Sequence, residues 1–292
     1  MSSEDAPSTW SGVDIAVPPP AHRLPGVSMA GFRQALPAPV DIAMVAHPSV
    51  TLLIDLSGED GLVYETGARR GRGSVVIGLA PGALRASGLV GECLQIRLRP
   101  AVAAAVLGSP ADAGAESLAD VWGLDTGRFE ERLRTAGSWD ERFAMATDLV
   151  RQRIGDGGPR VDPEVAYIWR RIVAGGGRVR VDSLADEVGW SRKRLWARFR
   201  AQLGPTPKRA ARLVRFDHAA HLLAAGLPPA GVAAESGYVD QSHLHRETKA
   251  FTGLTPTAVA AAPWLAIDDI AWPDLWRAGR PVPRSARGSG RR

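Results

Sequence analysis

The chain of 292 residues contains a single cysteine, Cys93, and therefore cannot form a disulfide bond within itself. No apolar run is long enough to cross a membrane, and the first residues lack the basic and then apolar pattern of a secretory signal. We therefore expect a cytoplasmic protein without a membrane partner. The 45% hydrophobic content is ample for buried cores, and the length favours two domains over one.

Histidine is scarce as well, and only His22 and His47 precede residue 160. A metal-dependent barrel needs a cluster of histidine and glutamate on its strands, and neither histidine lies in a strand-like segment. His218 and His221 stand at i and i+3 in a helix-like segment, where we expect core or surface histidines rather than metal ligands. The sequence thus indicates no metal site, no cofactor and no metal enzyme.

The segment from Ser183 to Thr257 contains one motif twice. Residues 184–190 (LADEVGW) and 232–238 (VAAESGY) align at an offset of 48, and their apolar, alanine, glutamate, glycine and aromatic positions coincide. After the turn the offset is 49, which pairs Gly204 with Gly253 and Pro207 with Pro256. An internal repeat of this kind predicts two copies of one supersecondary unit.

Each copy has the order of elements of a helix-turn-helix. A short helix stops at a glycine, Gly189 or Gly237, because glycine readily adopts the left-handed conformation that ends a helix. A second helix follows at once. Ser191 is its predicted N-cap in the first copy, and Asp240 or Ser242 in the second, because a short side-chain oxygen accepts from the free amides of the first turn.

The second helix of each copy has an inner and an outer stripe. In the first copy the inner residues recur every four positions and are expected to face the core: Leu195, Phe199 and Leu203. The outer positions i, i+3, i+4 and i+7 are Lys193, Trp196, Ala197 and Arg200. A shift of 49 residues gives the corresponding outer positions of the second copy, Ser242, His245, Arg246 and Lys249. Both stripes carry hydrogen-bond donors.

The chemistry of the outer stripes suits the major groove of DNA, where Arg or Lys binds guanine and Gln or Asn binds adenine. The predicted base-reading residues are Lys193, Gln241 and Arg246. Ring or apolar contacts to base edges are expected from Trp196 and His245. The expected phosphate contacts are Arg192, Arg194, Arg200 and Lys249, and Ser191, Ala197 and Ser242 complete the predicted DNA-binding set. A lone helical arginine is usually a solvated charge, but two matching stripes favour DNA binding.

Two runs of sequence resemble the paired helix-turn-helix domain of AraC/XylS-type transcriptional regulators. They are Ser191-Arg-Lys-Arg-Leu-Trp-Ala-Arg-Phe199 with Leu203-Gly-Pro-Thr-Pro207, and Gly237-Tyr-Val-Asp-Gln-Ser-His-Leu-His-Arg246 with Gly253-Leu-Thr-Pro256. The resemblance covers about residues 161–262. It implies a bacterial transcription regulator, an activator or a repressor, that binds double-stranded promoter or operator DNA at the nucleoid and contacts RNA polymerase.

The sequence departs from the family pattern at two positions. Thr248 stands where the family usually has a core phenylalanine, which weakens the expected packing of the second recognition helix. Ala197 stands where some members have an arginine that faces the groove, which puts more weight on Lys193 and Trp196 for reading the first site.

Residues 208–225, between the two copies, are predicted to form one helix, a stiff spacer with a rise of about 1.5 Å per residue. We expect it to hold the recognition helices roughly 34 Å apart, so that a single chain spans two adjacent major grooves. Residues 160–262 hold 16 Lys or Arg against 9 Asp or Glu, whereas residues 1–159 hold 14 against 19. The basic excess therefore lies on the repeat, where it can neutralise phosphates.

The predicted fold class is α+β, with a β-rich N-terminal domain, barrel or cupin-like and carrying helices, followed by an all-α domain of two helix-turn-helix motifs joined by a linker helix. The predicted strands are 50–56, 74–78 and 93–98, and the predicted helices are 101–107, 118–122, 128–135, 139–154 and 163–174. The expected divisions are a flexible N-terminus 1–25, a sensory or dimerisation domain 26–155, a DNA-binding domain 160–262 and residues 263–292. The last combine a Trp-containing extension, expected to pack on the body or dock a partner, with a basic disordered tail.

By architecture, the resemblance implies an N-terminal domain that senses a signal or pairs two subunits, so a small-molecule effector and a homodimer stay open. Arg69, Arg70 and Arg72 can bind an anionic effector, although a solvated loop is the more common role of such residues. We do not expect an enzyme. The competing hypothesis is an enzyme with a DNA-targeting module that uses Cys93, whose sequence neighbours include no base. A third is a regulator controlled by a protein partner.

Overall fold

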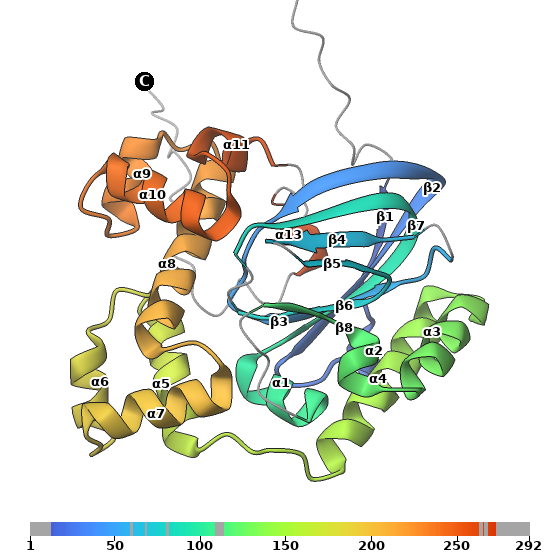
Figure 1. The fold of residues 1–292 in the computed structure, drawn as a ribbon, viewed down its shortest axis with the longest axis horizontal. Helices are drawn as coiled ribbons and strands as arrows, with labels where there is room; N and C mark the ends of the chain where they lie inside the picture. The colour runs from blue at the N-terminus through green and yellow to red at the C-terminus, as the bar shows by residue number, and fades with distance from the viewer. Residues whose placement is uncertain are drawn as a thin grey trace, which may run out of the picture.

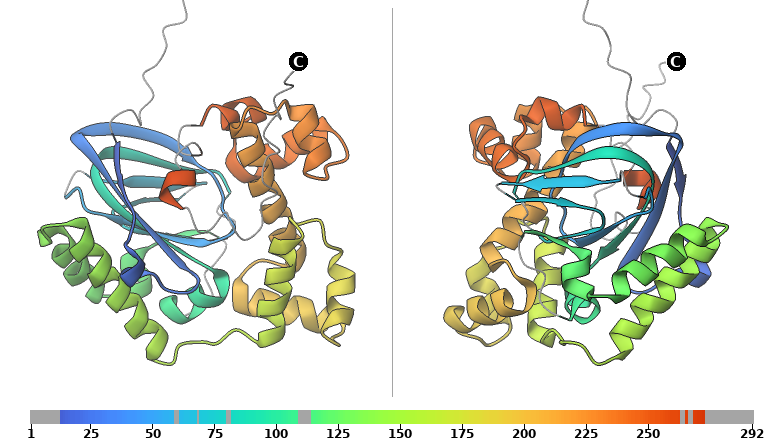
Figure 2. Two further views of the ribbon diagram at one scale, coloured as in Figure 1. Left: turned by 180° about the vertical axis from the view of Figure 1, so that it is seen from behind. Right: turned by 45° about the vertical axis from the view of Figure 1, so that its right-hand side comes forward.

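The computed structural model describes residues 13–58, 61–67, 69–79, 82–108, 114–262, 265 and 268–272. A curled β-sheet with helices along one side forms the N-terminal half, and a second, wholly helical half lies beside it (Figure 1). Both further views show the same arrangement (Figure 2). The predicted fold class is confirmed. No helix among the described residues is long and apolar enough to cross a membrane.

In the described part of the chain, eight strands form one antiparallel sheet. Their bounds are β1 (Val13–Ala16), β2 (Val27–Met44), β3 (Val50–Asp55), β4 (Val63–Thr66), β5 (Arg69–Arg72), β6 (Val75–Ile77), β7 (Leu84–Leu98) and β8 (Ala115–Ser117). The order is β1-β2-β7-β3-β6-β8, with β4 pairing with β7 and β5 with β4. The long β7 therefore contacts β2, β3 and β4 and organises the whole sheet.

The sequence pattern explains most of these strands. Every residue of β3 is buried, as its nearly continuous apolar run requires. Along the last part of β7, Leu94, Ile96 and Leu98 are fully buried, while the residues between them are half-buried, which is the alternation of a strand with one face on the core. The register of β2 against β7 shifts between Arg33 and Ala38, and this irregularity tolerates proline within the strand.

Two expectations for this half are wrong. Residues 13–25, expected to belong to a flexible start, contain β1 and the 3-10 helix η1 (Pro20–His22), because Val13–Ala16 pairs with β2 from Gly31 to Gln34. Arg69–Arg72, expected as a loop, is strand β5 and pairs with β4. In both cases the backbone hydrogen bonds of an adjacent strand override local residues that favour irregular structure.

Helices pack along one end of the sheet and make up the whole of the other half. In the N-terminal half they are α1 (Pro100–Leu107), α2 (Leu118–Trp122), α3 (Asp125–Thr135) and α4 (Trp139–Gly155). The helical half contains α5 (Pro163–Ala174), α6 (Val181–Glu187), α7 (Arg192–Leu203), α8 (Pro207–Ala224), α9 (Pro229–Glu235), α10 (Gln241–Thr252) and α11 (Pro256–Ala260). A final short helix, α13 (Asp268–Ala271), lies apart from the others, against the sheet (Figure 2).

One apolar cluster runs through both halves. It connects Leu52 and Ile96 of the sheet with Phe143 of α4, and continues to Phe199 of α7 and Phe216 of α8. Helix α1 lies against α7, so the contact between the halves includes a predicted recognition helix. Because the core is continuous, the helical half is held in a defined position on the sheet rather than carried on a free linker.

Candidate nucleic-acid interface

The two turns of the repeat have the same backbone geometry. Gly189 has φ +65° and Gly237 has φ +74°, both in the left-handed region that glycine adopts without a Cβ clash. The aromatic residue after each glycine donates its amide to the alanine five residues earlier: Trp190 N lies 3.0 Å from the Ala185 oxygen, and Tyr238 N lies 2.8 Å from the Ala233 oxygen. The repeat found in the sequence is therefore a repeat of structure.

Each recognition helix begins at a side-chain cap. The Ser191 hydroxyl accepts from the Arg194 amide at 3.2 Å, and the Asp240 carboxylate accepts from the His243 amide at 2.6 Å. Of the two candidates named for the second copy, Asp240 is thus the cap. The predicted inner stripe of α7 is buried and consists of Leu195, Phe199 and Leu203, and the inner side of α10 buries Leu244, Thr248 and Phe251.

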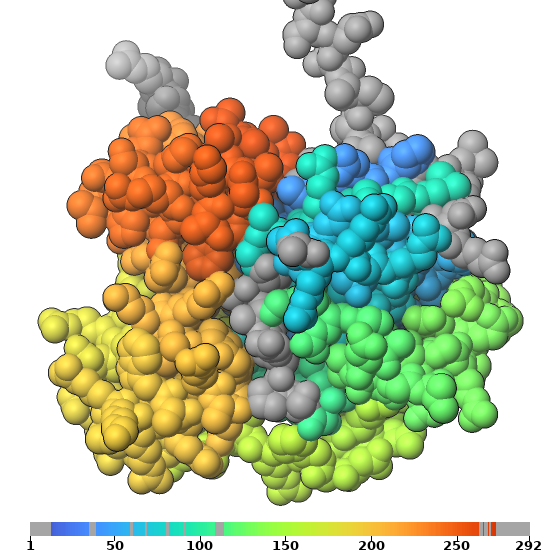
Figure 3. All heavy atoms as spheres, viewed as in Figure 1, coloured from blue at the N-terminus to red at the C-terminus, as the bar shows by residue number. Residues whose placement is uncertain are grey.

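Every predicted DNA-contacting side chain is exposed in the structure. On the first unit these are Ser191, Arg192, Lys193, Arg194, Trp196, Ala197 and Arg200; on the second they are Gln241, Ser242, His245, Arg246 and Lys249. Trp196 is 39% exposed, which is high for a side chain of its size and apolar character. Seen in the space-filling view, the two units lie one above the other along one side of the molecule, next to the N-terminal half (Figure 3).

Two of the exposed arginines already have partners within the first unit. Arg192 Nε lies 3.2 Å from Asp182 of α6, and both side chains are well exposed. The Arg194 guanidinium lies 4.5 Å from the ring centre of Trp190, in a cation-π contact. The Arg192 ion pair is exposed and contributes little stability, and Arg194 is itself exposed although Trp190 is buried, so both cations remain available to bind a phosphate.

Arg198, on the flank of α7, has a structural role instead. Its Nε and Nη2 donate to the Asp162 carboxylate at 2.8 and 2.9 Å. Gln202 accepts from the Asp162 backbone amide at 2.9 Å, which ties the start of α5 to α7. The sequence analysis left Arg198 out of the DNA-binding set, and this bidentate pair is a physical reason to keep it out.

A buried carboxylate holds the second unit together, and the sequence analysis did not find it. Glu247 of α10 is 4% exposed and pairs with Arg212 and Arg215 of α8, the latter at 3.3 Å. The Tyr238 hydroxyl lies 3.5 Å from the same carboxylate, and burial together with the charge of Glu247 raises the pKa of Tyr238. The turn, the linker helix and the recognition helix therefore meet at one charge.

Thr248, the departure from the family pattern, is fully buried. Its hydroxyl donates to the Leu244 carbonyl one turn earlier, at 2.8 Å, so the polar atom is satisfied inside the core. Next to it the rings of Phe216 and Phe251 stack at 5.0 Å and 19°. The aromatic contact between α8 and α10 thus comes from Phe251 rather than from position 248.

One further residue connects the two units. Arg178, in the loop between α5 and α6, donates from Nη1 to the Glu235 carbonyl at 3.3 Å, across 57 positions of sequence. Its aliphatic stem covers Gly237, where an added Cβ would come within 2.8 Å of Arg178 Cδ. Nothing in the local sequence around Arg178 indicates this contact, because it depends on how the units pack.

The thiol of Cys93 lies in β7 and packs against the cluster formed by Ala30, Phe32, Ala271 and Trp272. The pKa of the Cys93 thiol is raised to about 12, mainly by burial and then by the charges of Asp55 and Glu92. A nucleophilic cysteine needs a lowered pKa, so the environment of this thiol opposes the enzyme hypothesis. Among the described residues, no group of three His, Cys, Asp or Glu side chains is placed to hold a metal ion.

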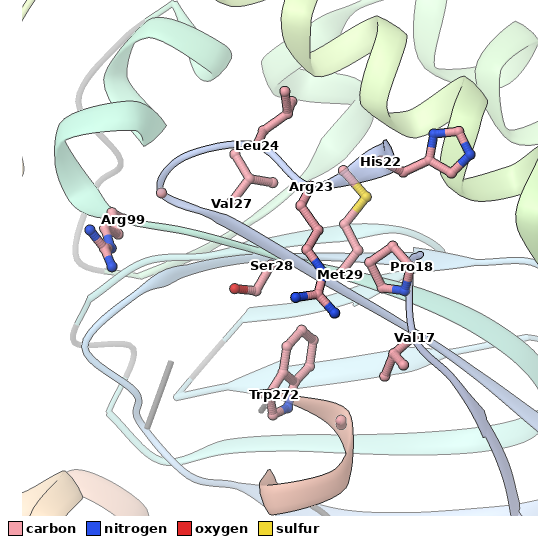
Figure 4. A pocket seen from close by; sticks show the side chains of 12 residues that line it. Val17, Pro18, His22, Arg23, Leu24, Val27, Ser28, Met29, Arg99 and Trp272 are labelled. Carbon is pink, nitrogen blue, oxygen red and sulfur yellow. The ribbon is translucent and has the colours of Figure 1, made fainter. Parts of the chain in front are cut away.

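A pocket of about 130 Å³ lies where η1 and the start of β2 meet the C-terminal segment (Figure 4). Its lining is mixed: Val17, Val27 and Met29 are apolar, with Trp272 on one side, whereas His22, Arg23, Ser28 and Arg99 are polar or charged. Arg23 extends into the same space as the Trp272 ring from the opposite side. The pocket thus brings apolar walls and positively charged side chains together in a small space.

A family model and a curated relative each match a part of the chain. A family described as a helix-turn-helix domain matches residues 184–262. The uncharacterized HTH-type transcriptional regulator YbfI of Bacillus subtilis is 36% identical over 66 residues, 23% of this chain and 24% of that protein. The matched region thus spans about a quarter of the length of this relative.

Two solved structures are similar over different lengths of the chain. The match to ToxT from Vibrio cholerae O395 covers 82% of this chain and 98% of the ToxT chain. The identity is 9% and the TM-score is 0.47. The match to the C-terminal domain of AraT, a response regulator from Geobacillus stearothermophilus, covers 45% of this chain and 98% of the AraT domain. The identity is 18% and the TM-score is 0.33.

The two capped recognition helices, their glycine turns and the family match together define a DNA-binding helix-turn-helix domain. Two units joined by the linker helix α8 make it a paired domain. It is a domain of the AraC/XylS type, as the two sequence runs beginning at Ser191 and Gly237 predicted.

Proposed function

We propose that the chain is a sequence-specific transcription regulator that reads two adjacent major grooves, one with α7 and one with α10. The observation that carries this proposal is the repeated turn followed by a fully exposed outer stripe. In both units the same amide-to-alanine hydrogen bond closes the turn, and the residues 49 positions apart face solvent. A helix presented in this way fits a major groove.

Within this proposal the exposed side chains divide into two groups. Lys193, Gln241 and Arg246 read base edges through hydrogen bonds, while Trp196 and His245 make ring or apolar contacts. The second group positions the helices on the backbone through phosphates and consists of Arg192, Arg194, Arg200 and Lys249. Ser191, Ala197 and Ser242 allow close approach at the ends and middle of the stripes.

The linker helix supports reading by a single chain. Helix α8 has 18 residues, which at about 1.5 Å per residue gives a rod of roughly 27 Å. Adjacent major grooves on one face of DNA are roughly 34 Å apart, and α8 separates the two recognition helices in the chain and packs against both of them. A domain of residues 160–262 would therefore read a site without twofold symmetry, next to a sensory domain of residues 26–155.

Selection from randomised duplex DNA with the full-length protein tests this function. The selected duplex should outcompete a scrambled duplex of the same length and composition by about 10³-fold or more at physiological salt. A control variant, Arg198→Ala, alters an arginine of α7 that pairs with Asp162 and should select the same sequence. Equal affinity for selected and scrambled duplexes would reduce the chain to a non-specific DNA binder.

For the N-terminal half we propose a small anionic effector with an apolar body, bound in the pocket beside Trp272. Arg23 and Arg99 supply positive charge at its rim, and Val27 and Met29 supply apolar surface. Titration with carboxylates of increasing chain length, followed by thermal unfolding, should raise the melting temperature for a subset of them. If none does, control by a protein partner becomes the better hypothesis. Contact with RNA polymerase and pairing of two chains also belong to this proposal.

A further inference from the structure

The chain returns to its N-terminal half after the DNA-binding domain. Helix α13 lies against the concave side of the curled sheet (Figure 2), and Trp272 follows it directly in the chain. Trp272 is only 1% exposed, and its ring centre lies 6.4 Å from that of Phe32 on β2. Ala30 completes the fully buried part of this contact, and Val13 and Ile15 of β1 flank it. A tryptophan buried this fully is the anchor of the segment.

Arg97 of β7 binds both ends of this short helix. Its guanidinium lies 4.0 Å from the ring centre of Trp272, and its Nη2 lies 3.2 Å from the Asp268 carboxylate. Asp268 and Trp272 are four residues apart, so one turn of helix presents both groups to one arginine. The sheet therefore carries a built binding site for an acidic and aromatic segment of this chain.

The second carboxylate oxygen of Asp268 reaches the DNA-binding domain. It lies 3.1 Å from Nε2 of His221, which is on the linker helix α8. On the preceding turn of α8, Asp217 lies 3.7 Å from His47, in the connection between β2 and β3. Asp268 thus joins the sheet, the linker helix and the C-terminal segment at a single buried point.

The N-terminal half also contacts both helix-turn-helix units directly. Helix α1 lies against α7 of the first unit. At the end of α10 in the second unit, a Cβ added to Gly253 would lie 3.2 Å from the Cβ of Ala83, which precedes β7. Whatever holds the sheet against α8 therefore also fixes the positions of the two recognition helices relative to each other.

We propose that residues 268–272 act as an intramolecular latch. When they are bound to the sheet through Arg97, the N-terminal half braces both helix-turn-helix units and restricts the protein to one spacing of its two DNA blocks. When they are released, only α8 and the contacts of Arg178 with the second unit connect the two units, and other spacings are accepted. This inference rests on the proposed two-groove reading of DNA.

Two features make the latch releasable. Among the described atoms, Nε and Nη1 of Arg97 are buried without a hydrogen-bond acceptor, so release lets them bind water and offsets part of the lost contact. Trp272 also forms one wall of the pocket beside η1, so a molecule that needs more room there displaces the anchor. The effector pocket and the latch therefore share a side chain.

The test compares Trp272→Ala and Asp268→Asn with Ile270→Ala, in full-length protein. Ile270 lies on the same helix α13 but is 60% exposed, so its variant is the matched control. The rate of Cys93 alkylation measures release of residues 268–272. Cys93 packs against Trp272 and should react faster once Trp272 no longer covers it. Binding is measured on selected duplexes whose two blocks are moved apart by zero, one or two base pairs.

Wild type and Ile270→Ala should lose about tenfold in affinity when the spacing changes, because the second block can no longer bind together with the first. The two latch variants should bind all spacings within about threefold and expose Cys93. Faster alkylation with an unchanged spacing profile would overturn the latch while leaving the proposed function intact. If Trp272→Ala does not fold, the isosteric Asp268→Asn decides. Failure of wild type to prefer its selected duplex would overturn the proposed function itself.

Discussion

Nε2 of His221 lies 3.1 Å from the Asp268 carboxylate, although 47 residues separate the two in sequence. The other ring nitrogen, Nδ1, lies 2.7 Å from the Asp217 carbonyl. Because both neighbours are acceptors, the ring satisfies both contacts only as a doubly protonated cation. Burial alone would lower the pKa of His221, but the hydrogen bond to Asp268 and the charges of Asp217 and Asp268 raise it above its ordinary value.

We expect the stability of the folded chain to pass through a maximum near neutral pH. The raised pKa of His221 stabilises the fold below the ordinary histidine value of about 6.5, and this stabilisation is lost as pH rises through the raised pKa. Asp268 acts in the opposite direction. Burial opposes its ionisation, but Arg97 and His221 hold its pKa well below the usual range, so its contribution is lost in strong acid.

His47 also contributes to the loss of stability below neutral pH. The pKa of His47 is lowered well below its ordinary value, mainly by burial and then by the charge of Arg97, although the charge of Asp268 acts against this shift. Its stabilisation is present above about pH 6.5 and declines as pH falls. Thermal unfolding from pH 5 to 10 should show a steeper alkaline decline for wild type than for His221→Gln. The same alkaline slope in both proteins would mean that His221 is not the titrating group.

Glu247→Ala should destabilise the second helix-turn-helix unit by about 3 kcal/mol, because removal of one member of a buried ion pair leaves the partner charge uncompensated. Arg215 would lose its buried acceptor, and Arg212 would turn to solvent. Urea unfolding followed by far-UV circular dichroism measures the change. Glu235→Ala, an exposed carboxylate on α9 of the same unit, is the control and should differ little from wild type. Equal losses would indicate that Glu247 acts only through helix propensity.

Arg246→Ala and Arg194→Ala should weaken DNA binding in different ways. Loss of Arg246 should reduce discrimination at one base position by about 1–3 kcal/mol and leave the other positions unchanged. Loss of Arg194 should weaken binding to all sequences alike. It should also reduce the slope of log affinity against log salt concentration by the amount that about one phosphate contact contributes. Competition binding with single-base variants of the selected site, at two salt concentrations, separates the two outcomes. If both changes weaken all sequences equally, the division into base and phosphate contacts is wrong.

Cys93→Ser should leave sequence-specific DNA binding within about threefold of wild type, a change worth less than 1 kcal/mol. The thiol has a raised pKa of about 12 and therefore forms little thiolate at neutral pH. Iodoacetamide at pH 8 should accordingly modify folded protein far more slowly than protein unfolded in urea. Rapid modification of the folded protein, together with loss of function in Cys93→Ser, would revive the enzyme hypothesis.

The helical elements could be predicted closely because their signals are local. The predicted helices 118–122 and 163–174 coincide with α2 and α5, and the Gly189 and Gly237 turns form as the repeat indicated. The strands were predicted less completely. β1 is followed by three prolines and β2 contains two, and β2 pairs with β7, which begins 40 residues after β2 ends.

In the candidate site, too, local features could be predicted from the sequence and long-range contacts could not. The exposed stripes follow from helical periodicity, and all their residues face solvent as the spacing implied. The contacts of Glu247 with α8, of Arg178 with the second turn and of Asp268 with His221 join segments far apart in the chain. No local pattern specifies such pairs, because each depends on the packed arrangement of several elements.

Footprinting of the selected duplex with full-length protein tests the central claim most directly. We expect two protected blocks about ten base pairs apart on one face of the DNA, with protection weakened only in the first block by Lys193→Ala and only in the second by Arg246→Ala. A single protected block, unaffected by one of these two substitutions, would contradict the reading of two adjacent grooves by α7 and α10.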